Sequence, residues 1–195
     1  MRREVAILGA TGSVGKSALD LIERSPERFE VVAVTAASNS QALAEIAVRT
    51  GAKLAVIADE DRLGELRERL GPGTTCRAAA GASALKDAAA GEADLVVAAI
   101  VGCAGLDPVM AAVTAGKTVA LANKEALVTA GALMIDQAHR SGATLLPIDS
   151  EHNAIFQCLA GSRAQDVARI VLTASGGPFR TASAEVMAAA SPAEA

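Results

Sequence analysis

The sequence predicts an α/β fold in which helices cover both faces of a parallel sheet. Short apolar runs alternate with segments in which apolar residues recur every three or four positions, and this alternation is typical of strand–helix–strand units. The runs are apolar throughout rather than at every second residue, as in strands buried on both faces. A glycine-rich turn joins the first run to the first helical segment. We therefore expect a doubly wound, Rossmann-type domain over residues 1–149.

The elements of this domain follow in a regular order. In the first helix, Val14, Ala18, Leu21 and Ile22 share one face, and the third helix starts with acidic residues and ends at the turn Gly71–Gly73. The expected strands span 4–9, 29–37, 53–58, 93–100, 117–122 and 143–149. The expected helices span 13–24, 40–50, 59–70, 106–116 and 124–140.

Residues 150–195 are expected to begin a second, α+β catalytic or substrate domain. "EHNAIFQCL" has a helical pattern, and "LTASGGPFR" (172–180) is interpreted as a strand followed by a Gly-Gly-Pro turn. The remaining "TASAEVMAAASPAEA" shows no further strand pattern. We expect this domain to be truncated.

Composition narrows the classes of function. Apolar residues make up 51% of the chain and charged residues 21%, which is typical of a globular protein. Aromatic residues are only 2%, so the stacking platforms of single-strand nucleic-acid binders are missing. A net charge of −4 provides no basic footprint, and we expect no nucleic-acid partner.

Cysteines and termini suggest a cytoplasmic, soluble protein. Cys76, Cys103 and Cys158 are far apart and in no CxxC pattern, so three free and mostly buried thiols are expected in a reducing compartment. The start "MRREVAILGATG" is interpreted as a first strand rather than a signal peptide. "LVVAAIVGCAGL" is shorter than the roughly 18 residues of a membrane span, and no membrane association is expected.

The turn "GATGSVG", from Gly9 to Gly15, indicates dinucleotide binding. Gly9 allows a sharp turn off the strand, Gly12 lets the backbone approach a pyrophosphate, and Gly15 lets the helix pack close to the sheet. The N–H groups at the helix start would then face the phosphates. The alternative is a plain tight turn between strand and helix.

The end of the second strand favours NADP over NAD. NAD sites usually carry an acidic residue there for the ribose 2′-hydroxyl, whereas this chain has Ala37, Ser38 and Asn39. Ser38 and Asn39 could donate hydrogen bonds to a 2′-phosphate. An alternative, compatible with the first, is that they cap the next helix.

Two further polar groups follow the last two strands. Asn123, Lys124 and Glu125 come after the strand at 117–122, at the edge where such sheets bind ligands. Asn123 could simply cap the helix, but a lysine in a first helical turn opposes the helix dipole and suggests an anionic or polar ligand.

The second group is Asp149, Ser150 and Glu151. The two carboxylates suit a hard cation such as Mg²⁺ or Mn²⁺. Alternatively, Asp149 or Ser150 caps the following helix, with Glu151 in its first turn. The residues alone leave both interpretations open.

Together these motifs resemble the 1-deoxy-D-xylulose 5-phosphate reductoisomerase family. The resemblance rests on four blocks in order across residues 4–180: "GATGSVG", "IVGCAGLDPVMAAVTAGKTVALANKEALVTAG", "PIDSEHNAIFQCL" and "LTASGGPFR". It implies an enzyme of non-mevalonate isoprenoid biosynthesis that converts this sugar phosphate to 2-C-methyl-D-erythritol 4-phosphate, with NADPH and Mg²⁺, Mn²⁺ or Co²⁺. It also implies a homodimer when full length.

The resemblance also implies roles for individual residues. The cofactor would be bound by Gly9, Thr11, Gly12, Ser13, Val14, Ala37, Ser38, Asn39, Asn123 and Glu125. The sugar phosphate would be contacted by Lys124, Ser150, Glu151 and Ser175. Asp149 and Glu151 would ligate the metal and, with Lys124, carry the catalysis.

Two departures from the family pattern matter. The family often has a glycine, a basic residue and an asparagine where this chain has Ala37, Ser38 and Asn39. The family also continues beyond residue 195 with a lid, a phosphate site, a third metal-binding glutamate and a helical domain. We therefore expect little or no turnover from residues 1–195 alone. The alternatives are a dinucleotide-binding fragment without turnover and another Rossmann reductase, of the semialdehyde or homoserine dehydrogenase type.

Overall fold

The computed structural model describes residues 2–172 and 177–194, which form two compact units. The first unit is Met1–Asp149 and the second is Ser150–Ala195.

The first unit contains a seven-stranded sheet in which every neighbouring pair is parallel. The order β4-β3-β2-β1-β5-β6-β7 runs outward in both directions from β1, as in a doubly wound fold. The predicted fold class is confirmed. The strands are β1 Arg3–Leu8, β2 Phe29–Ala36, β3 Leu54–Ile57, β4 Arg77–Ala80, β5 Leu95–Ala98, β6 Thr118–Leu121 and β7 Thr144–Pro147.

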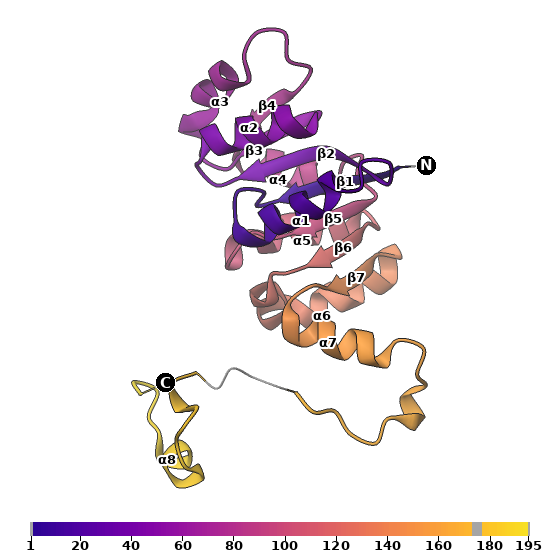
Figure 1. Ribbon diagram of the computed structural model, residues 1–195, viewed down its shortest axis with the longest axis vertical. Coiled ribbons are helices and arrows are strands. Elements are labelled where there is room, and N and C mark those ends of the chain that lie inside the picture. Colours follow the sequence, from indigo (N-terminus) through magenta and orange to yellow (C-terminus); the bar gives the residue numbers. More distant parts are fainter. Residues whose placement is uncertain (1, 173–176, 195) are drawn as a thin grey trace. The chain divides into compact units, whose positions relative to one another are not determined.

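Helices pack on both faces of this sheet and bury two separate cores (Figure 1). One core receives apolar side chains from α1 (Ser13–Glu23), α2 (Ser40–Thr50) and α3 (Leu63–Leu70). The other receives them from α4 (Gly81–Ala90), α5 (Leu106–Thr114) and α6 (Lys124–Ser141). This arrangement explains why the strands are apolar at consecutive positions.

Strand β1 shows how the two cores share one strand. Val5 and Ile7 face the first core, whereas Ala6 and Leu8 face the second, and all four are fully buried. Successive side chains of a strand point to opposite faces of the sheet. Burying a Val, Leu or Ile side chain contributes about 1.5–3 kcal/mol. The buried residues of both cores are aliphatic apart from Met134 and Cys76, and the aromatic Phe29 packs half-buried against the first core.

Three features differ from the sequence prediction. Strand β4 and helix α4 were not expected, because "RAAAGASALKDAAA" is too rich in alanine to show a clear period. Helix α6 is interrupted at Ala130, whose φ of −138° and ψ of 24° are not helical, beside the helix-weakening Gly131. Of the free cysteines, only Cys76 is buried, and Cys103 and Cys158 are exposed, so the expectation of mostly buried thiols was wrong.

The second unit contains helix α7 (Ser150–Leu159), two short 3-10 helices (Ala164–Asp166 and Gly177–Phe179) and helix α8 (Ala184–Ala189). Neither α7 nor α8 has a buried residue. For residues 172–180 a strand and then a Gly-Gly-Pro turn were expected. Leu172 has no regular structure, residues 173–176 lie outside the described part of the chain, and Gly177–Phe179 forms a 3-10 helix. Among the described residues, no helix is long and apolar enough to cross a membrane.

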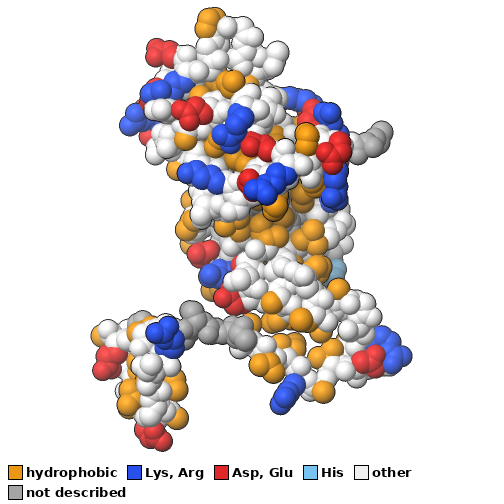
Figure 2. Space-filling view, viewed as in Figure 1, with side chains coloured by type: hydrophobic (Ala, Val, Ile, Leu, Met, Phe, Trp, Pro, Cys, Tyr) orange, Lys and Arg blue, Asp and Glu red, His pale blue; other side chains and the backbone are white. Residues whose placement is uncertain are grey.

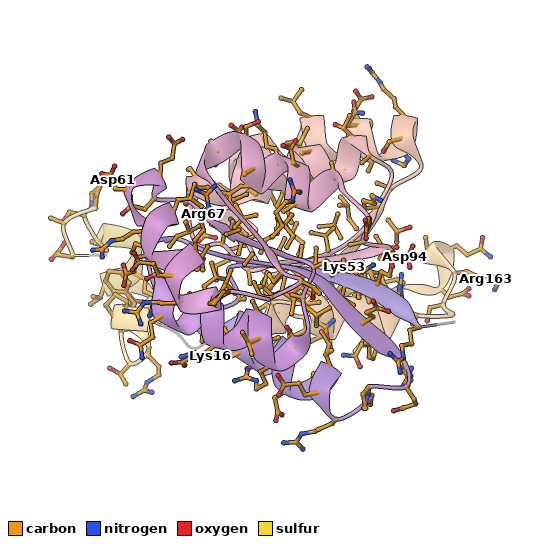
Figure 3. The ribbon with its side chains drawn as sticks, turned by 90° about the horizontal axis from the view of Figure 1, so that it is seen from above. Lys16, Lys53, Asp61, Arg67, Asp94 and Arg163 are labelled. Atoms are coloured by element: carbon orange, nitrogen blue, oxygen red, sulfur yellow. The ribbon has the colours of Figure 1, made fainter. Side chains whose placement is uncertain are left out.

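The two ends of the strands carry different chemistry. Lys53, which precedes β3, lies 3.0 Å from Glu92, 3.4 Å from Glu4 and 3.8 Å from Glu30. Figure 3 places Lys53 and Asp94 at this amino end, whereas Asp61 and Lys16 lie at the carboxyl end. These ion pairs therefore lie at the amino end of the sheet, opposite the edge at which the loops after β1, β5, β6 and β7 emerge.

Charged side chains of both signs intermingle over α2 and α3 (Figure 2). Arg69 donates two hydrogen bonds to Glu65 Oε1, at 2.9 and 2.8 Å, and Arg62 donates one to Oε2 at 3.0 Å. These bonds, first from Arg69, then from Arg62 and Ser40, lower the pKa of the Glu65 carboxyl from 4.5 to about 2. Glu65 thus binds both Arg62, the N-cap residue of α3, and Arg69 in the last turn of that helix.

This pKa predicts how stability changes with pH. The folded pKa lies below the unfolded one, so the contribution of Glu65 is complete above about pH 4.5 and is lost as pH falls toward about 2. The difference in Tm between wild type and Glu65→Gln, followed by circular dichroism, should be largest near neutral pH and shrink across that window. Glu68→Gln, on the exposed face of the same helix, is the control. A difference that stayed constant from neutral pH to about pH 2 would contradict the assignment.

Candidate functional site

Four neighbouring strands end level with one another. Leu8 pairs with Ala98, Ala98 with Leu121, and Leu121 with Pro147. The loops that follow β1, β5, β6 and β7 therefore leave the sheet side by side at its carboxyl edge. The strand order reverses between β1 and β5, and ligands of doubly wound proteins bind at such a switch point.

Gly9 and Gly15 are required by the close approach of backbone to backbone. Gly9 has a φ of +82°, and a Cβ there would lie 2.7 Å from the carbonyl oxygen of Ala99. A Cβ on Gly15 would overlap the Gly9 carbonyl oxygen and lie 2.7 Å from Ala10 Cα. Thr35 supports the same turn, because its hydroxyl accepts a hydrogen bond from Gly9 N at 2.9 Å.

Gly12 is different, because neither backbone conformation nor packing requires a glycine there. Its φ is −77°, and the nearest atom to an added Cβ would be Gly9 O at 3.4 Å, an ordinary contact. Gly12 is the N-cap of α1 and provides no side-chain cap for the first N–H groups of that helix. Because Gly12 has no side chain, there is room for an anionic group at the start of α1.

A pocket of about 310 Å³ opens at this point, within the range typical of small-molecule sites. It is formed by the glycine turn, the ends of β2 and β3, helix α4 and the loop after β5. Its lining residues are Gly9, Thr11, Gly12, Ala36, Ala37, Ala58, Leu85, Ala99, Ile100, Val101 and Ala104.

The predicted cofactor residues lie at or beside this pocket. Gly9, Thr11, Gly12 and Ala37 line it, and Ser13 and Val14 are the exposed first residues of α1. Ser38 is exposed, and Asn39 caps α2 by accepting a hydrogen bond from Ala42 N at 2.9 Å. The capping interpretation of Asn39 is thus confirmed, and binding of a 2′-phosphate by Ser38 and Asn39 stays a prediction.

Asn123 is almost completely buried, and its side chain bonds to three backbone groups of the protein. It caps α6 by accepting a hydrogen bond from Ala126 N at 2.9 Å. The expected helix cap is therefore present. Lys124 follows as the exposed first residue of α6, and Glu125 is half-buried in the first turn.

Asp149 lies two residues beyond Pro147, just as Asn123 lies two residues beyond Leu121, the residue paired with Pro147. The Asp149 side chain is half-buried. In the second unit, Ser150 and Glu151 begin α7, and Ser150 Oγ donates a hydrogen bond to Glu151 Oε2 at 2.7 Å. Ser175 lies outside the described residues.

The donor set at Asp149 and Glu151 fits a hard divalent cation in its chemistry, since both are carboxylates. In the described part of the chain, no group of three His, Cys, Asp or Glu side chains could hold a metal. Mg²⁺ is commonly held by one or two carboxylates together with substrate oxygens and waters. The assignment of Asp149 and Glu151 as metal ligands stays a prediction.

Sequence reasoning missed several residues that shape the pocket. Thr35 is a fully buried hydroxyl near the carboxyl end of β2, whereas Glu30, the other polar residue of that strand, lies near its start and is half-buried. A hydroxyl among the buried apolar residues of β2 was the available signal. Leu85 belongs to the helix that was not predicted, and Ala58, Ile100 and Val101 are apolar loop residues without a recognisable pattern.

Family models match most of the chain. Residues 5–131 match the model of 1-deoxy-D-xylulose 5-phosphate reductoisomerase, and residues 145–195 match the model of its C-terminal domain. The enzyme of this name from Zymomonas mobilis is 57% identical over 190 residues, covering 97% of this chain and 49% of the relative. That from Rhizobium meliloti is 54% identical over 189 residues, covering 96% and 48%. The chain spans about half the length of these curated relatives.

Solved structures agree with these matches. The Zymomonas mobilis reductoisomerase in complex with NADPH has a TM-score of 0.90 and 56% identity, covering all of this chain and 51% of that one. A reductoisomerase in complex with NADPH, fosmidomycin and magnesium has a TM-score of 0.85 and 40% identity, covering 99% and 50%. These likenesses favour this family over the dehydrogenase alternatives. The chain belongs to the 1-deoxy-D-xylulose 5-phosphate reductoisomerase family.

Proposed function

We propose that the protein to which this chain belongs converts 1-deoxy-D-xylulose 5-phosphate to 2-C-methyl-D-erythritol 4-phosphate, using NADPH and a divalent cation. The observation that carries the proposal is the level row of strand ends. That row brings the glycine turn, the Asn123–Glu125 segment and Asp149 to one edge of the sheet. A dinucleotide site beside a cationic and an anionic group is what a metal-assisted reduction of a sugar phosphate requires.

The chain's own residues bind and orient the cofactor. The uncapped start of α1 and the space at Gly12 receive the pyrophosphate. The apolar pocket lined by Ala36, Ala37 and Ala58 accepts the adenosine end. No acidic residue stands at Ala37–Asn39 to repel a 2′-phosphate. When bound, NADPH supplies the hydride.

Lys124 and the carboxylates act on the substrate. The exposed Lys124 ammonium group stabilises negative charge that develops on a substrate oxygen and assists proton transfer. Asp149 would hold the divalent cation, with Glu151, two residues further along the sequence, as a second carboxylate ligand. A divalent cation held there would supply Lewis-acid chemistry toward the substrate oxygens. Ser150, Glu151 and Ser175 are assigned to the sugar phosphate.

Further parts of the proposal rest on the family. The rest of the catalytic domain, including a third carboxylate ligand, would come from the half of the relatives that this chain does not span. The whole enzyme is proposed to be a cytoplasmic homodimer.

A second candidate applies to the 195 residues alone, which would bind the dinucleotide without turnover. The observation in its favour is the contrast between the units. The first has two buried cores, whereas the helices of the second bury no side chain within the described residues. Such a chain keeps the cofactor half of the site and lacks a formed catalytic half.

The glycines of the turn provide the first test. Gly12→Ala should lower Tm only slightly, because its Cβ makes only an ordinary contact and the one cost is that alanine is a poorer N-cap than glycine. It should nevertheless weaken NADPH binding about tenfold or more by filling the approach to α1. Gly15→Ala should destabilise the fold by about 1–3 kcal/mol through overpacking. NADPH fluorescence titration and urea unfolding measure the two effects. Wild-type affinity in Gly12→Ala would show that the turn binds no pyrophosphate.

A chimera tests the catalytic residues. We expect negligible NADPH oxidation from this chain with 1-deoxy-D-xylulose 5-phosphate and Mn²⁺. Joined at residue 195 to the remaining half of the Zymomonas mobilis relative, it should turn over and lose activity in EDTA. Lys124→Met and Asp149→Asn in the chimera should each lower kcat by about 100-fold or more while NADPH still binds.

Two results would contradict this account. Turnover by the 195-residue chain at the rate of the chimera would show that the catalytic half is already complete. An Asp149→Asn chimera with unchanged rate and unchanged Mn²⁺ dependence would remove this carboxylate from the metal site.

A further inference from the structure

The buried side chain of Asn123 joins two loops of the candidate site. Its amide nitrogen donates hydrogen bonds to the carbonyl oxygens of Ile100, at 2.6 Å, and Gly102, at 2.9 Å. Its amide oxygen accepts from Ala126 N at 2.9 Å. The residue is 3% exposed and does not line the pocket, so its amide lies inside the protein.

The two carbonyl groups stand on either side of a pocket residue. Ile100 and Val101 line the pocket, and Val101 is 83% exposed. Gly102 follows with a φ of +73°, and its carbonyl oxygen also accepts a hydrogen bond from Gly105 N at 3.2 Å. Asn123 therefore fixes the backbone immediately before and after Val101.

Gly105 provides the space in which this amide sits. A Cβ at Gly105 would overlap Asn123 Nδ2 and lie 2.9 Å from the Ile100 carbonyl oxygen. Because the φ of Gly105 is −80°, its backbone conformation does not require glycine. Glycine is required there because the residue packs closely against the Asn123 amide and against Ile100.

We infer that Asn123 is a positioning residue, which sets the Ile100–Gly102 wall of the dinucleotide pocket relative to the start of α6. This inference rests on the proposed dinucleotide function and changes the role expected for Asn123. Its side-chain groups hold the protein together around the cofactor instead of contacting the cofactor. The same bonds fix the position of the next residue, Lys124, relative to the Ile100–Gly102 wall of the pocket.

Asn123→Ser tests this role while keeping the helix cap. A serine hydroxyl can still accept from Ala126 N, but it is too short to bond both carbonyl groups. We expect the NADPH Kd of the 195-residue chain to rise at least about tenfold. Without ligand, amide hydrogen exchange should accelerate over residues 100–105 while the amides of β1 and β2 keep their protection.

Two further variants separate positioning from general loss of stability. Gly105→Ala leaves every hydrogen-bonding group in place and pushes on the amide, so it should accelerate exchange over the same residues and raise the Kd. Val113→Ala removes methyl groups from a buried residue in the last turn of α5, at the end of the helix opposite Gly105. It should lower Tm without changing the Kd or the exchange of residues 100–105. If Asn123→Ser does not fold, Gly105→Ala carries the test.

Each outcome decides a different point. Unchanged exchange over residues 100–105 in both Asn123→Ser and Gly105→Ala would overturn the inference. A raised Kd with unchanged exchange would instead assign Asn123 a direct contact with the cofactor, and would overturn it too. If the wild-type chain bound no NADPH, the proposed function would fail, whereas the exchange measurements would still report whether Asn123 holds the loop.

Discussion

The approach of the glycine turn to the backbone after β5 is the constraint on which the site depends. Gly9 leaves no space for a side chain against Ala99, and Gly15 leaves none against the turn itself. Strands β1 and β5 can therefore end level with each other, with the helix start directed at the switch point. Because β6 and β7 continue the same row by their own pairing, Lys124 and Asp149 follow strands that end at this edge.

The site divides into groups that hold the fold and groups left for ligands. Some polar side chains form hydrogen bonds with backbone groups around the pocket, namely those of Thr35, Asn39 and Asn123. Gly12 meets no such structural requirement. Lys124 is the exposed first residue of α6, where the helix dipole disfavours a positive charge. For these two residues the fold gives no reason for the residue type, and a bound ligand is the simplest explanation.

The sequence was informative where one strong local signal decided an element. Apolar runs bounded by turn residues predicted the strands other than β4, and "GATGSVG" predicted the turn and its helix. Strand β4 could not be found in this way, because Arg77–Ala80 forms a strand only through pairing with Leu54–Ile57 of β3. The bonds of Asn123 were equally hidden, since they reach residues more than 20 positions earlier. The exposure of Cys103 likewise depends on a loop path that no pattern encodes.

The central claim is that residues 1–149 form a dinucleotide site at the switch point beside Gly12. A fluorescence titration of the folded 195-residue chain with NADPH, and separately with NADH, tests it most directly. The account predicts saturable binding with NADPH clearly tighter, because no acidic residue follows β2 to repel the 2′-phosphate. Absence of binding to a chain that circular dichroism shows to be folded would contradict it, and the glycine turn would then be a structural turn only.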